Sequence, residues 1–404
     1  MITPLGKGVA TTWQNVVDGK SGIGAITRFD TTDYPVRIAG EVKDFDPRDY
    51  IDGKEVKKMD TFIQYAVASV GEALADAGVD HVSMPDSMKD RFGVMVGTGI
   101  GGLPEIERTA KTLREKGPKR VSPFFIPSVL ANLASGQVSI HFGLRGPNGC
   151  PVTACTTGSS AIGDAARIIE RGDADLMVAG GTESTITGLC VAGFAAAKAL
   201  SRRNDEPEKA SRPFDNNRDG FVMGEGCGVM VLENLESAKA RGARVYAMLD
   251  GYGMSGDAYH ITAPPEGGPG AVICMRHALK DAGVDLAEVG YINAHATSTM
   301  ADTIETQAIR TVFGEHADKL VVSSTKSMTG HLLGAAGGIE AIFAVKALET
   351  GIIPPTINLD NQDPACDLFY APNAAVKKDI TCSLSNSFGF GGVNGSLVFK
   401  KGVS

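Results

Sequence analysis

The sequence of 404 residues lacks any apolar run near the ~18 residues that a membrane-spanning helix needs, so we expect no membrane association. It has no Cys-x-x-Cys pair, and its seven cysteines are scattered and odd in number, which argues against a zinc site or a redox dithiol. No signal peptide is apparent. These absences indicate a reducing compartment. We expect a cytoplasmic protein, or one of the mitochondrial or plastid matrix if a longer precursor exists.

Positive charge is also scarce. The formal net charge is −8, whereas proteins that bind nucleic acids usually carry the opposite sign, so we expect no nucleic-acid partner. Basic residues do occur in pairs, and three of these are Lys57-Lys58, Lys119-Arg120 and Arg202-Arg203. The simplest interpretation of each pair is solvated surface charge. The alternative is a docking point for an acidic partner.

An internal repeat is the most informative feature of the chain. The segment "ALADAGVD" at residues 73–80 recurs as "ALKDAGVD" at 278–285. Each copy closes an amphipathic helix, for which Gly78 and Gly283 are suitable C-terminal caps, and each is followed by a buried strand. Further on, each half has a turn of small hydroxyl residues that leads into a helix, and then a glycine-rich hairpin strand. The chain therefore resembles itself twice.

Alternating strands and helices predict parallel sheets with crossover helices, and the repeat predicts two pseudo-symmetric α/β halves. We place them at residues 1–243 and 244–404. The second half opens with a strand, "RVYAMLDGYGMSG", whereas the first opens at "MITPLGKGV", which resembles a turn. A first strand of roughly ten residues is expected either to be absent or to belong to a longer chain, by comparison with the other half.

A glycine-rich loop raises an alternative function. Gly97, Gly99 and Gly102 follow a predicted strand with the G-x-G-x-x-G spacing of dinucleotide-binding proteins, which suggests a nicotinamide-dependent oxidoreductase. The acidic residue that should follow about 20 positions later is missing, and the loop does not belong to the first strand and helix of a half. A pocket-lining loop is the better interpretation. We also find no G-x-S-x-G nucleophile motif.

Cys155 lies among threonine, serine and glycine in "PVTACTTGSS", directly before a predicted helix that begins near residue 156 or 157. Unpaired backbone N–H groups and the helix dipole at that position favour a thiolate. The same N–H groups could bind the oxygen of a tetrahedral thioester intermediate. The alternative, an inert buried cysteine, is equally compatible with this segment alone.

Two histidines strengthen the catalytic interpretation. His295 lies at a strand end in "NAHATST", and His331 lies in "TGHLLGAAGG" at the expected start of a helix, where a charged imidazole is disfavoured. Two neutral imidazoles could donate hydrogen bonds to a developing enolate. Lys326 would add a fixed positive charge, and Glu340 could orient or balance it. Because Cys155, His295 and Lys326 all follow predicted strands, we expect them to meet in one cleft between the halves.

Seven motifs, in order and spanning nearly the whole chain, carry a family resemblance. They are "GPNGCPVTACTTGSSAIGDAARII", "RPFDNNRDGFVMGEG", "GYGMSGDAYHITAPP", "NAHATST", "SSTKSMTGHLLGAAGGIEA", "PPTINLDN" and "NSFGFGGVNGSL". The sequence resembles the β-ketoacyl-acyl carrier protein synthases, the elongating condensing enzymes of fatty acid synthesis. The resemblance implies a thiolase-like duplicated fold, with stacked mixed sheets in an α-β-α-β-α layering.

The resemblance also implies roles for single residues. Cys155 would be the acylated nucleophile, His295 and His331 the pair that stabilises the enolate during decarboxylation, and Lys326 their electrostatic support with Glu340 beside it. The remaining implied positions are the oxyanion and gating residue Phe390, the pantetheine-binding Thr297 and Thr299, the acyl-pocket residue Ile100, and a possible monovalent-cation site at Asn293, Glu340, Ser385 and Asn386.

The implied reaction is a decarboxylative Claisen condensation, in which malonyl-carrier protein extends an acyl group held on Cys155 by two carbons. No organic cofactor would be required. The expected partners are acyl- and malonyl-loaded carrier proteins, for which Lys57-Lys58 and Arg202-Arg203 are docking candidates, and a second copy of the chain in a homodimer. A thiolase is the nearest alternative, but the loop "FGFGGVNG" lacks the second cysteine that a thiolase needs.

Overall fold

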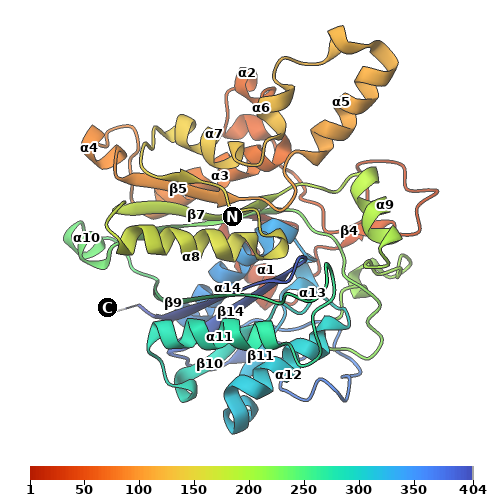
Figure 1. The fold of residues 1–404 in the computed structure, drawn as a ribbon, viewed down its shortest axis with the longest axis vertical. Coiled ribbons are helices and arrows are strands. Elements are labelled where there is room, and N and C mark those ends of the chain that lie inside the picture. Colours follow the sequence, from red (N-terminus) through yellow and green to blue (C-terminus); the bar gives the residue numbers. More distant parts are fainter. Residues whose placement is uncertain (403–404) are drawn as a thin grey trace.

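The computed structural model describes residues 1–402 and contains two mixed sheets (Figure 1). In the first sheet β5 and β7 are parallel and are joined by a crossover connection, whereas β8 is antiparallel to β7. The full order is β2 (Gly6–Lys7), β1 (Ile2–Thr3), β8 (Gly226–Glu233), β7 (Leu176–Glu183), β5 (Phe92–Gly97) and β6 (Asn148–Gly149).

The second sheet repeats this plan. Strands β10 and β14 are parallel, and β15 is antiparallel to both β14 and β9. Its order is β11 (Val321–Ser323), β10 (Val289–Asn293), β14 (Cys382–Gly389), β15 (Val393–Lys401) and β9 (Ala247–Gly256). The matching strand order and directions confirm the predicted duplicated α/β architecture. The boundary proposed at residues 243 and 244 stays a prediction.

Helices form the remaining layers (Figure 1). The first sheet is covered on its outer face by α3 (Thr61–Asp76) and α7 (Leu133–Phe142), and the second by α11 (Pro269–Ala282) and α12 (Ala301–Phe313). Two helices, α8 (Thr157–Glu170) and α14 (Ala336–Thr350), lie between the sheets. As expected for the helix caps, Gly78 and Gly283 follow α3 and α11 with φ of 67° and 59°.

The side-chain alternation of the strands explains this layering. On β7, Leu176 and Val178 belong to the core beneath α3, whereas Met177 and Ala179 belong to the core between the two sheets. Successive residues of a strand point to opposite faces, so a strand covered by helices on both sides is apolar at every position. The central core therefore joins both halves into one body.

Glycines let the two central helices approach each other. A Cβ on Gly158 of α8 would lie 2.4 Å from the backbone nitrogen of Gly338 on α14, and one on Gly338 would lie 2.2 Å from the carbonyl oxygen of Gly228. Only residues without a side chain fit at these contacts. The close approach brings together the segments that precede the two helices, which contain Cys155 and His331.

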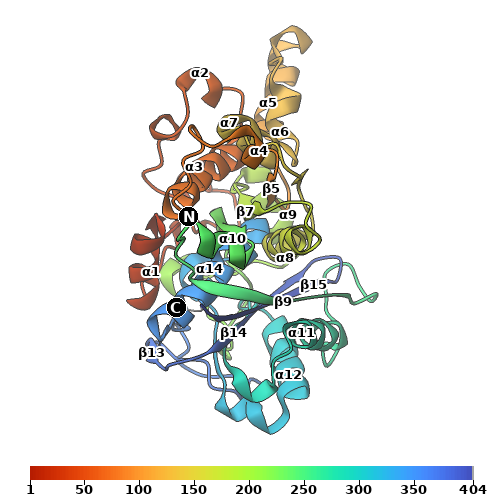
Figure 2. The ribbon, with the colours of Figure 1, turned by 90° about the vertical axis from the view of Figure 1, so that its left-hand side faces the viewer.

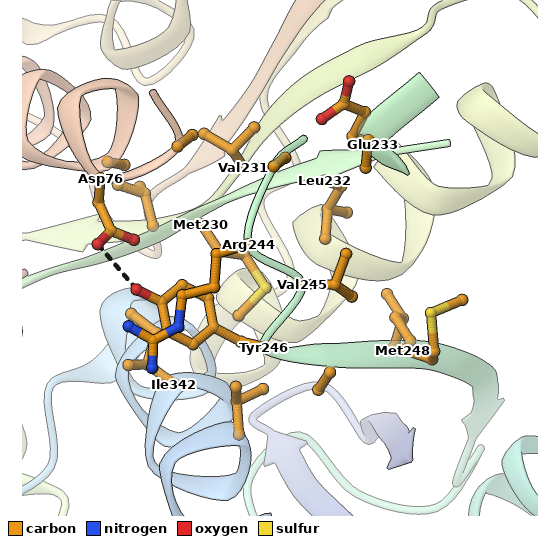
Figure 3. A pocket seen from close by; sticks show the side chains of 18 of the residues that line it. Asp76, Met230, Val231, Leu232, Glu233, Arg244, Val245, Tyr246, Met248 and Ile342 are labelled. Atoms are coloured by element: carbon orange, nitrogen blue, oxygen red, sulfur yellow. Dashed lines mark hydrogen bonds between the residues drawn. The ribbon is translucent and has the colours of Figure 1, made fainter. Parts of the chain in front are cut away.

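The two sheets differ beside β8 of the first half and its equivalent in the second half, β15. In the second half β9 pairs with β15 from Ala247 to Gly256, but in the first half β1 pairs with β8 only at Ile2 and Cys227. Beside the rest of the β8 edge lies a groove of about 740 Å³, lined by Met230 and Leu232 of β8 and closed at one end where the Tyr246 hydroxyl donates to Asp76 (Figure 3). The expectation of a missing first strand stays a prediction.

We expect this edge to accept an added strand. Placing a copy of the first seven residues of β9, Ala247–Gly253, ahead of Met1 should raise the melting temperature by several degrees, because the segment would pair with β8 and bury apolar groups in the groove. Thermal unfolding of the extended and original chains is the measurement. The control extension has proline at alternate positions, which cannot donate to the ladder. Equal melting temperatures for the two extensions would contradict the expectation.

No helix within residues 1–402 is long and apolar enough to span a bilayer. All seven cysteines are free thiols. The expected cytoplasmic location stays a prediction.

Candidate active site

Cys155 lies in a single 3₁₀ turn, Ala154–Thr156, directly before α8, so the predicted helix start is confirmed. Two hydrogen bonds tie this turn and the first turn of α8 to the other half. The Thr156 hydroxyl donates to the backbone carbonyl oxygen of Val393 (2.7 Å), and the hydroxyls of Ser159 and Ser387 are 2.8 Å apart. Cys155 therefore lies at the junction of the two halves, where the residue as a whole is half-buried.

The resting state of Cys155 differs from the expectation. Burial raises the pKa of the Cys155 thiol to about 12, although the backbone N–H of Phe390 and the charge of Lys326 act to lower it. The prediction of a thiolate at the helix N-terminus is wrong, because the cost of desolvating the charged sulfur exceeds the stabilisation from the surrounding dipoles and charge. Cys155 is a thiol in the free protein.

His295 follows β10, as predicted. Its backbone N–H donates to Glu305 Oε1 (3.0 Å), and the next N–H, of Ala296, donates to Glu305 Oε2 (2.8 Å), so one buried carboxylate fixes the turn that presents the imidazole. Burial lowers the pKa of His295 well below its ordinary value, and the charges of Lys326 and His331 lower it further. The ring is neutral near pH 7.

His331 is neutral for a different reason than predicted. It is not in the first turn of a helix: α13 (Lys326–Thr329) ends before it, and α14 begins only at Ala336. Its backbone is held instead by Val222, whose carbonyl oxygen accepts the His331 N–H at 2.7 Å. Burial, followed by the charge of Lys326, lowers the pKa of His331 well below its ordinary value. The expected helix-terminus effect is replaced by desolvation.

The two imidazole rings lie edge to face. Their ring centroids are 5.3 Å apart, with an angle of 87° between the planes. The Nδ1 atom of each ring is buried with no hydrogen-bond partner in the part of the chain that the structure describes. Both rings therefore keep hydrogen-bonding capacity that the protein leaves unused.

Lys326 and Glu340 form a buried ion pair beside the histidines. Lys326 Nζ lies 2.5 Å from Glu340 Oε1, and each side chain is only 1% exposed. Burial raises the pKa of Glu340 to about 7, while Lys326 acts to lower it. The Lys326 charge acts on the Cys155 thiol and on both imidazoles, so the structure brings all four predicted central residues into one site.

The predicted peripheral residues surround this centre. The Thr297 and Thr299 hydroxyls are 3.1 Å apart in the loop after His295. Phe390 is 38% exposed, and its ring centroid lies 6.3 Å from that of Phe194. Ile100 is 40% exposed in the glycine-rich loop after β5. These positions suit an entrance and a pocket wall, but their roles stay predictions.

The candidate cation residues are only partly free. Asn293 Oδ1 and Ser385 Oγ are buried without a hydrogen-bond partner among residues 1–402, which suits a hard monovalent cation, whereas the Glu340 carboxylate is already paired with Lys326. The Asn386 side chain is also engaged: its Oδ1 accepts from Ser396 (2.7 Å) and its Nδ2 donates to Glu305 (3.0 Å). Two of the four predicted side chains therefore remain free for such an ion.

Sequence reasoning missed the buried residues that hold the loops. Asp302 accepts hydrogen bonds from the backbone N–H groups of Thr297 (2.9 Å) and Thr299 (3.3 Å), and the Arg218 guanidinium donates to the Thr299 carbonyl oxygen (2.7 Å). Glu183 was also missed. The signal that could have found these residues is the occurrence of charged side chains inside otherwise apolar or glycine-rich segments, such as "VAGGTES".

The glycine-rich loop binds a carboxyl group of the chain itself and not a ligand. Its N–H groups at Gly99 and Ile100 donate to the Glu183 carboxylate, at 2.8 and 3.3 Å. A dinucleotide pyrophosphate would need these N–H groups for itself. The nicotinamide-dependent alternative finds no support at this loop.

Comparisons with known proteins agree with the site. The family model "Beta-ketoacyl synthase, N-terminal domain" matches residues 1–238, and "Beta-ketoacyl synthase, C-terminal domain" matches residues 246–360. The chain belongs to the beta-ketoacyl synthase family. This membership confirms the predicted resemblance and the expected class of condensing acyltransferases.

Two curated relatives and one solved structure illustrate the similarity. The chain is 53% identical over 401 residues to "3-oxoacyl-[acyl-carrier-protein] synthase 2" of Staphylococcus aureus (strain N315), covering 99% of this chain and 96% of that protein. It is 52% identical over 402 residues to the protein of the same name from Coxiella burnetii, with the same coverage. A ketosynthase solved in complex with its type II polyketide acyl-carrier protein has a TM-score of 0.90 at 33% identity, covering 100% of this chain and 97% of that one. This structural similarity confirms the thiolase-like fold class.

Proposed function

We propose that this protein is a 3-oxoacyl-[acyl-carrier-protein] synthase, which lengthens acyl chains by two carbons through decarboxylative condensation with a malonyl thioester. The observation that carries the proposal is the pair of neutral imidazoles, 5.3 Å apart, beside one thiol and one buried ammonium group. Neutral imidazoles donate a hydrogen bond to a forming enolate, whereas a cationic acid would protonate it.

The first half-reaction loads Cys155. Its sulfur attacks the carbonyl carbon of the acyl-carrier thioester, and the carbon–sulfur bond to the carrier breaks. The proton of the Cys155 thiol passes to the departing carrier sulfur. The tetrahedral oxygen is stabilised by the backbone N–H groups of Cys155 and Phe390, and the latter already reaches the sulfur in the free protein.

The second half-reaction forms the new carbon–carbon bond. The malonyl thioester loses its carboxylate as carbon dioxide, and the electron pair moves into an enolate whose oxygen accepts hydrogen bonds from His295 and His331. The enolate carbon then attacks the acyl group on Cys155. The carbon–sulfur bond breaks, the sulfur leaves with its electron pair, and Cys155 takes up a proton from water.

The proposed partners are carrier proteins bearing these two thioesters. Of the candidate basic pairs, Lys57 and Arg202 are exposed and have no ion pair within residues 1–402, whereas Lys58 pairs with Glu55 and Arg203 with Glu206. Lys57 and Arg202 are therefore the cations free to attract an acidic carrier.

A second copy of the chain is also a proposed partner. Helix α5 (Leu103–Lys116) extends beyond the rest of the molecule (Figure 2). Large apolar side chains are exposed on α5, on or beside α6 (Phe125–Val129), on α7 and shortly after β6. They are Ile106, Leu113, Phe124, Ile126, Leu130, Ile140 and Val152. Such a gathering of apolar groups marks a protein interface. Light scattering that gives the mass of one chain would rule out the homodimer.

No organic cofactor enters these steps. A monovalent cation, if bound, would be held by Asn293 and Ser385, beside the Glu340 carboxylate that Lys326 already balances. Its role would be structural, because none of these groups reaches the reacting carbon in the proposed mechanism. A melting temperature that does not change when potassium is replaced by a bulky organic cation would exclude it.

The test compares two acyl donors, an acyl-carrier protein and the same acyl group on free pantetheine. Replacing Lys57 and Arg202 with glutamate should raise KM at least about five-fold for the carrier substrate, with kcat unchanged, because charge pairs mainly govern encounter. KM for the pantetheine substrate should not change. Replacing Lys119 and Arg120 with glutamate is the control, since it makes the same charge change at an exposed basic pair. No two-carbon extension from either donor would end the proposed function.

A further inference from the structure

Glu183, at the end of β7, is a fully buried carboxylate with an unusual set of partners. Its Oε1 accepts from the Thr98 hydroxyl (2.8 Å) and the Ile100 N–H (3.3 Å), and its Oε2 accepts from the N–H groups of Gly99 (2.8 Å) and Gly334 (2.9 Å). It forms no ion pair with any residue from 1 to 402. Burial raises the pKa of Glu183, and these neutral donors, without an ion pair, act to lower it.

These donors come from both halves of the molecule. Thr98, Gly99 and Ile100 form the loop at the proposed acyl pocket, whereas Gly334 lies three residues after His331. A Cβ on Gly99 would lie 2.7 Å from Glu183 Oε2 and 3.4 Å from the carbonyl oxygen of Ala154, the neighbour of Cys155. The carboxylate thus lies where the pocket loop, the nucleophile turn and the His331 segment meet.

Glu225 provides the comparison within the same chain. It is equally buried, but it pairs with the Arg28 guanidinium and accepts further hydrogen bonds from Val42 and Ser184. Buried carboxylates are normally compensated in this way by a cation. Glu183 has no such cation, and its partners are four hydrogen-bond donors from the walls of the site.

We propose that Glu183 is a positioning residue for the condensation, which holds the acyl-pocket loop against the His331 segment and places a negative charge beside Cys155. The effect of Glu183 on substrates rests on the proposed function. The effect of Glu183 on the Cys155 sulfur can be measured without any turnover. Glu183 raises the pKa of the Cys155 thiol, in the same direction as burial and Glu340, whereas Phe390 and Lys326 lower it. Glu183 therefore helps to keep the unloaded enzyme in the thiol form.

The experiment measures the alkylation of Cys155 by iodoacetamide as a function of pH, followed by peptide mass mapping. Glu183→Gln removes the charge and keeps the shape, so its alkylation curve should move to lower pH, with at least about three-fold faster modification at pH 8. Glu225→Gln is the matched control: it removes an equally buried carboxylate that does not act on Cys155, and its curve should coincide with that of the wild type.

A second variant separates the charge from the hydrogen bonds. Thr98→Val removes the hydroxyl that donates to Glu183 and accepts from the Gly101 N–H, but retains the Glu183 carboxyl group and its three backbone donors. It should leave the alkylation curve unchanged and alter the ratio of kcat/KM between short and long acyl donors at least about three-fold. Thermal melts establish that each variant is folded. If Glu183→Gln is unfolded, the outcome for Thr98→Val decides the positioning role.

Two results would overturn the proposal. One is an unchanged alkylation curve for folded Glu183→Gln, and the other is an unchanged acyl-length preference for Thr98→Val. Because alkylation needs no substrate, a protein that fails to condense thioesters would still report the effect of Glu183 on Cys155. Failure of this inference and failure of the proposed function are therefore distinguishable.

Discussion

Replacing Cys155 with alanine is expected to abolish chain extension, lowering the rate by at least about three orders of magnitude. The alanine side chain cannot hold the acyl group, so the two half-reactions lose their shared intermediate. The fold should be unaffected, because the backbone of the turn is held by Thr156 and Ser159 rather than by the sulfur. The measurement is the formation of the 3-oxoacyl product from acyl- and malonyl-carrier proteins.

Cys150 offers a matched control for this variant. It is also a free thiol, five residues earlier, and its sulfur lies 3.2 Å from the carbonyl oxygen of Ala131. Cys150→Ala should retain extension activity. Persistent extension by Cys155→Ala, or an equal loss in both variants, would mean that the nucleophile is assigned incorrectly.

Replacing His331 with alanine should produce the second largest effect, a loss of about 10²–10³ in the rate of condensation, as for the removal of one oxyanion donor. The loading of Cys155 should continue, because His331 acts on the malonyl group in the later step. His331→Asn should recover part of the rate, since an amide supplies a neutral N–H donor. Single-turnover assays that separate acyl transfer from decarboxylation provide the measurement.

The pH dependence distinguishes a neutral donor from a cationic one. The pKa values of His295 and His331 are both lowered, so both rings stay neutral as the pH falls through 6.5, where an ordinary histidine takes up its proton. The two histidines should therefore cause no loss of decarboxylation rate between pH 7.5 and 6. Burial raises the pKa values of Glu305 and Glu340 to about 7, so the measurement compares the wild type with Glu305→Gln and Glu340→Gln. A fall in rate with a midpoint near pH 6.5 that persists in both variants, or equal activities for His331→Ala and His331→Asn, would contradict neutral donors.

Much of the architecture could be predicted because the chain repeats itself. The two copies of "ALxDAGVD" established two equivalent halves, and the strand ends that precede His295 and Lys326 are short-range features. Parallel strands then place such ends at one edge, which explains why residues from both halves converge. The family motifs added the roles but not the geometry.

Electrostatics could not be predicted in the same way. The thiol form of Cys155 depends on burial beneath segments that are distant in sequence, including the Phe390 loop, and no local pattern reports that burial. For His331 the neutral state was predicted correctly from the wrong cause, because the helix expected at that residue begins five residues later. Glu183 escaped notice because its four donors are backbone and hydroxyl groups, which leave no charge pattern in the sequence.

The most direct test of the account is peptide mass spectrometry after one equivalent of acyl-carrier protein is added to the enzyme. We predict a single acyl adduct on the peptide that contains Cys155. The adduct should disappear when malonyl-carrier protein is added, as a 3-oxoacyl product two carbons longer than the donor appears. Formation of that product without an adduct at Cys155, or with the acyl group on another residue, would contradict the account.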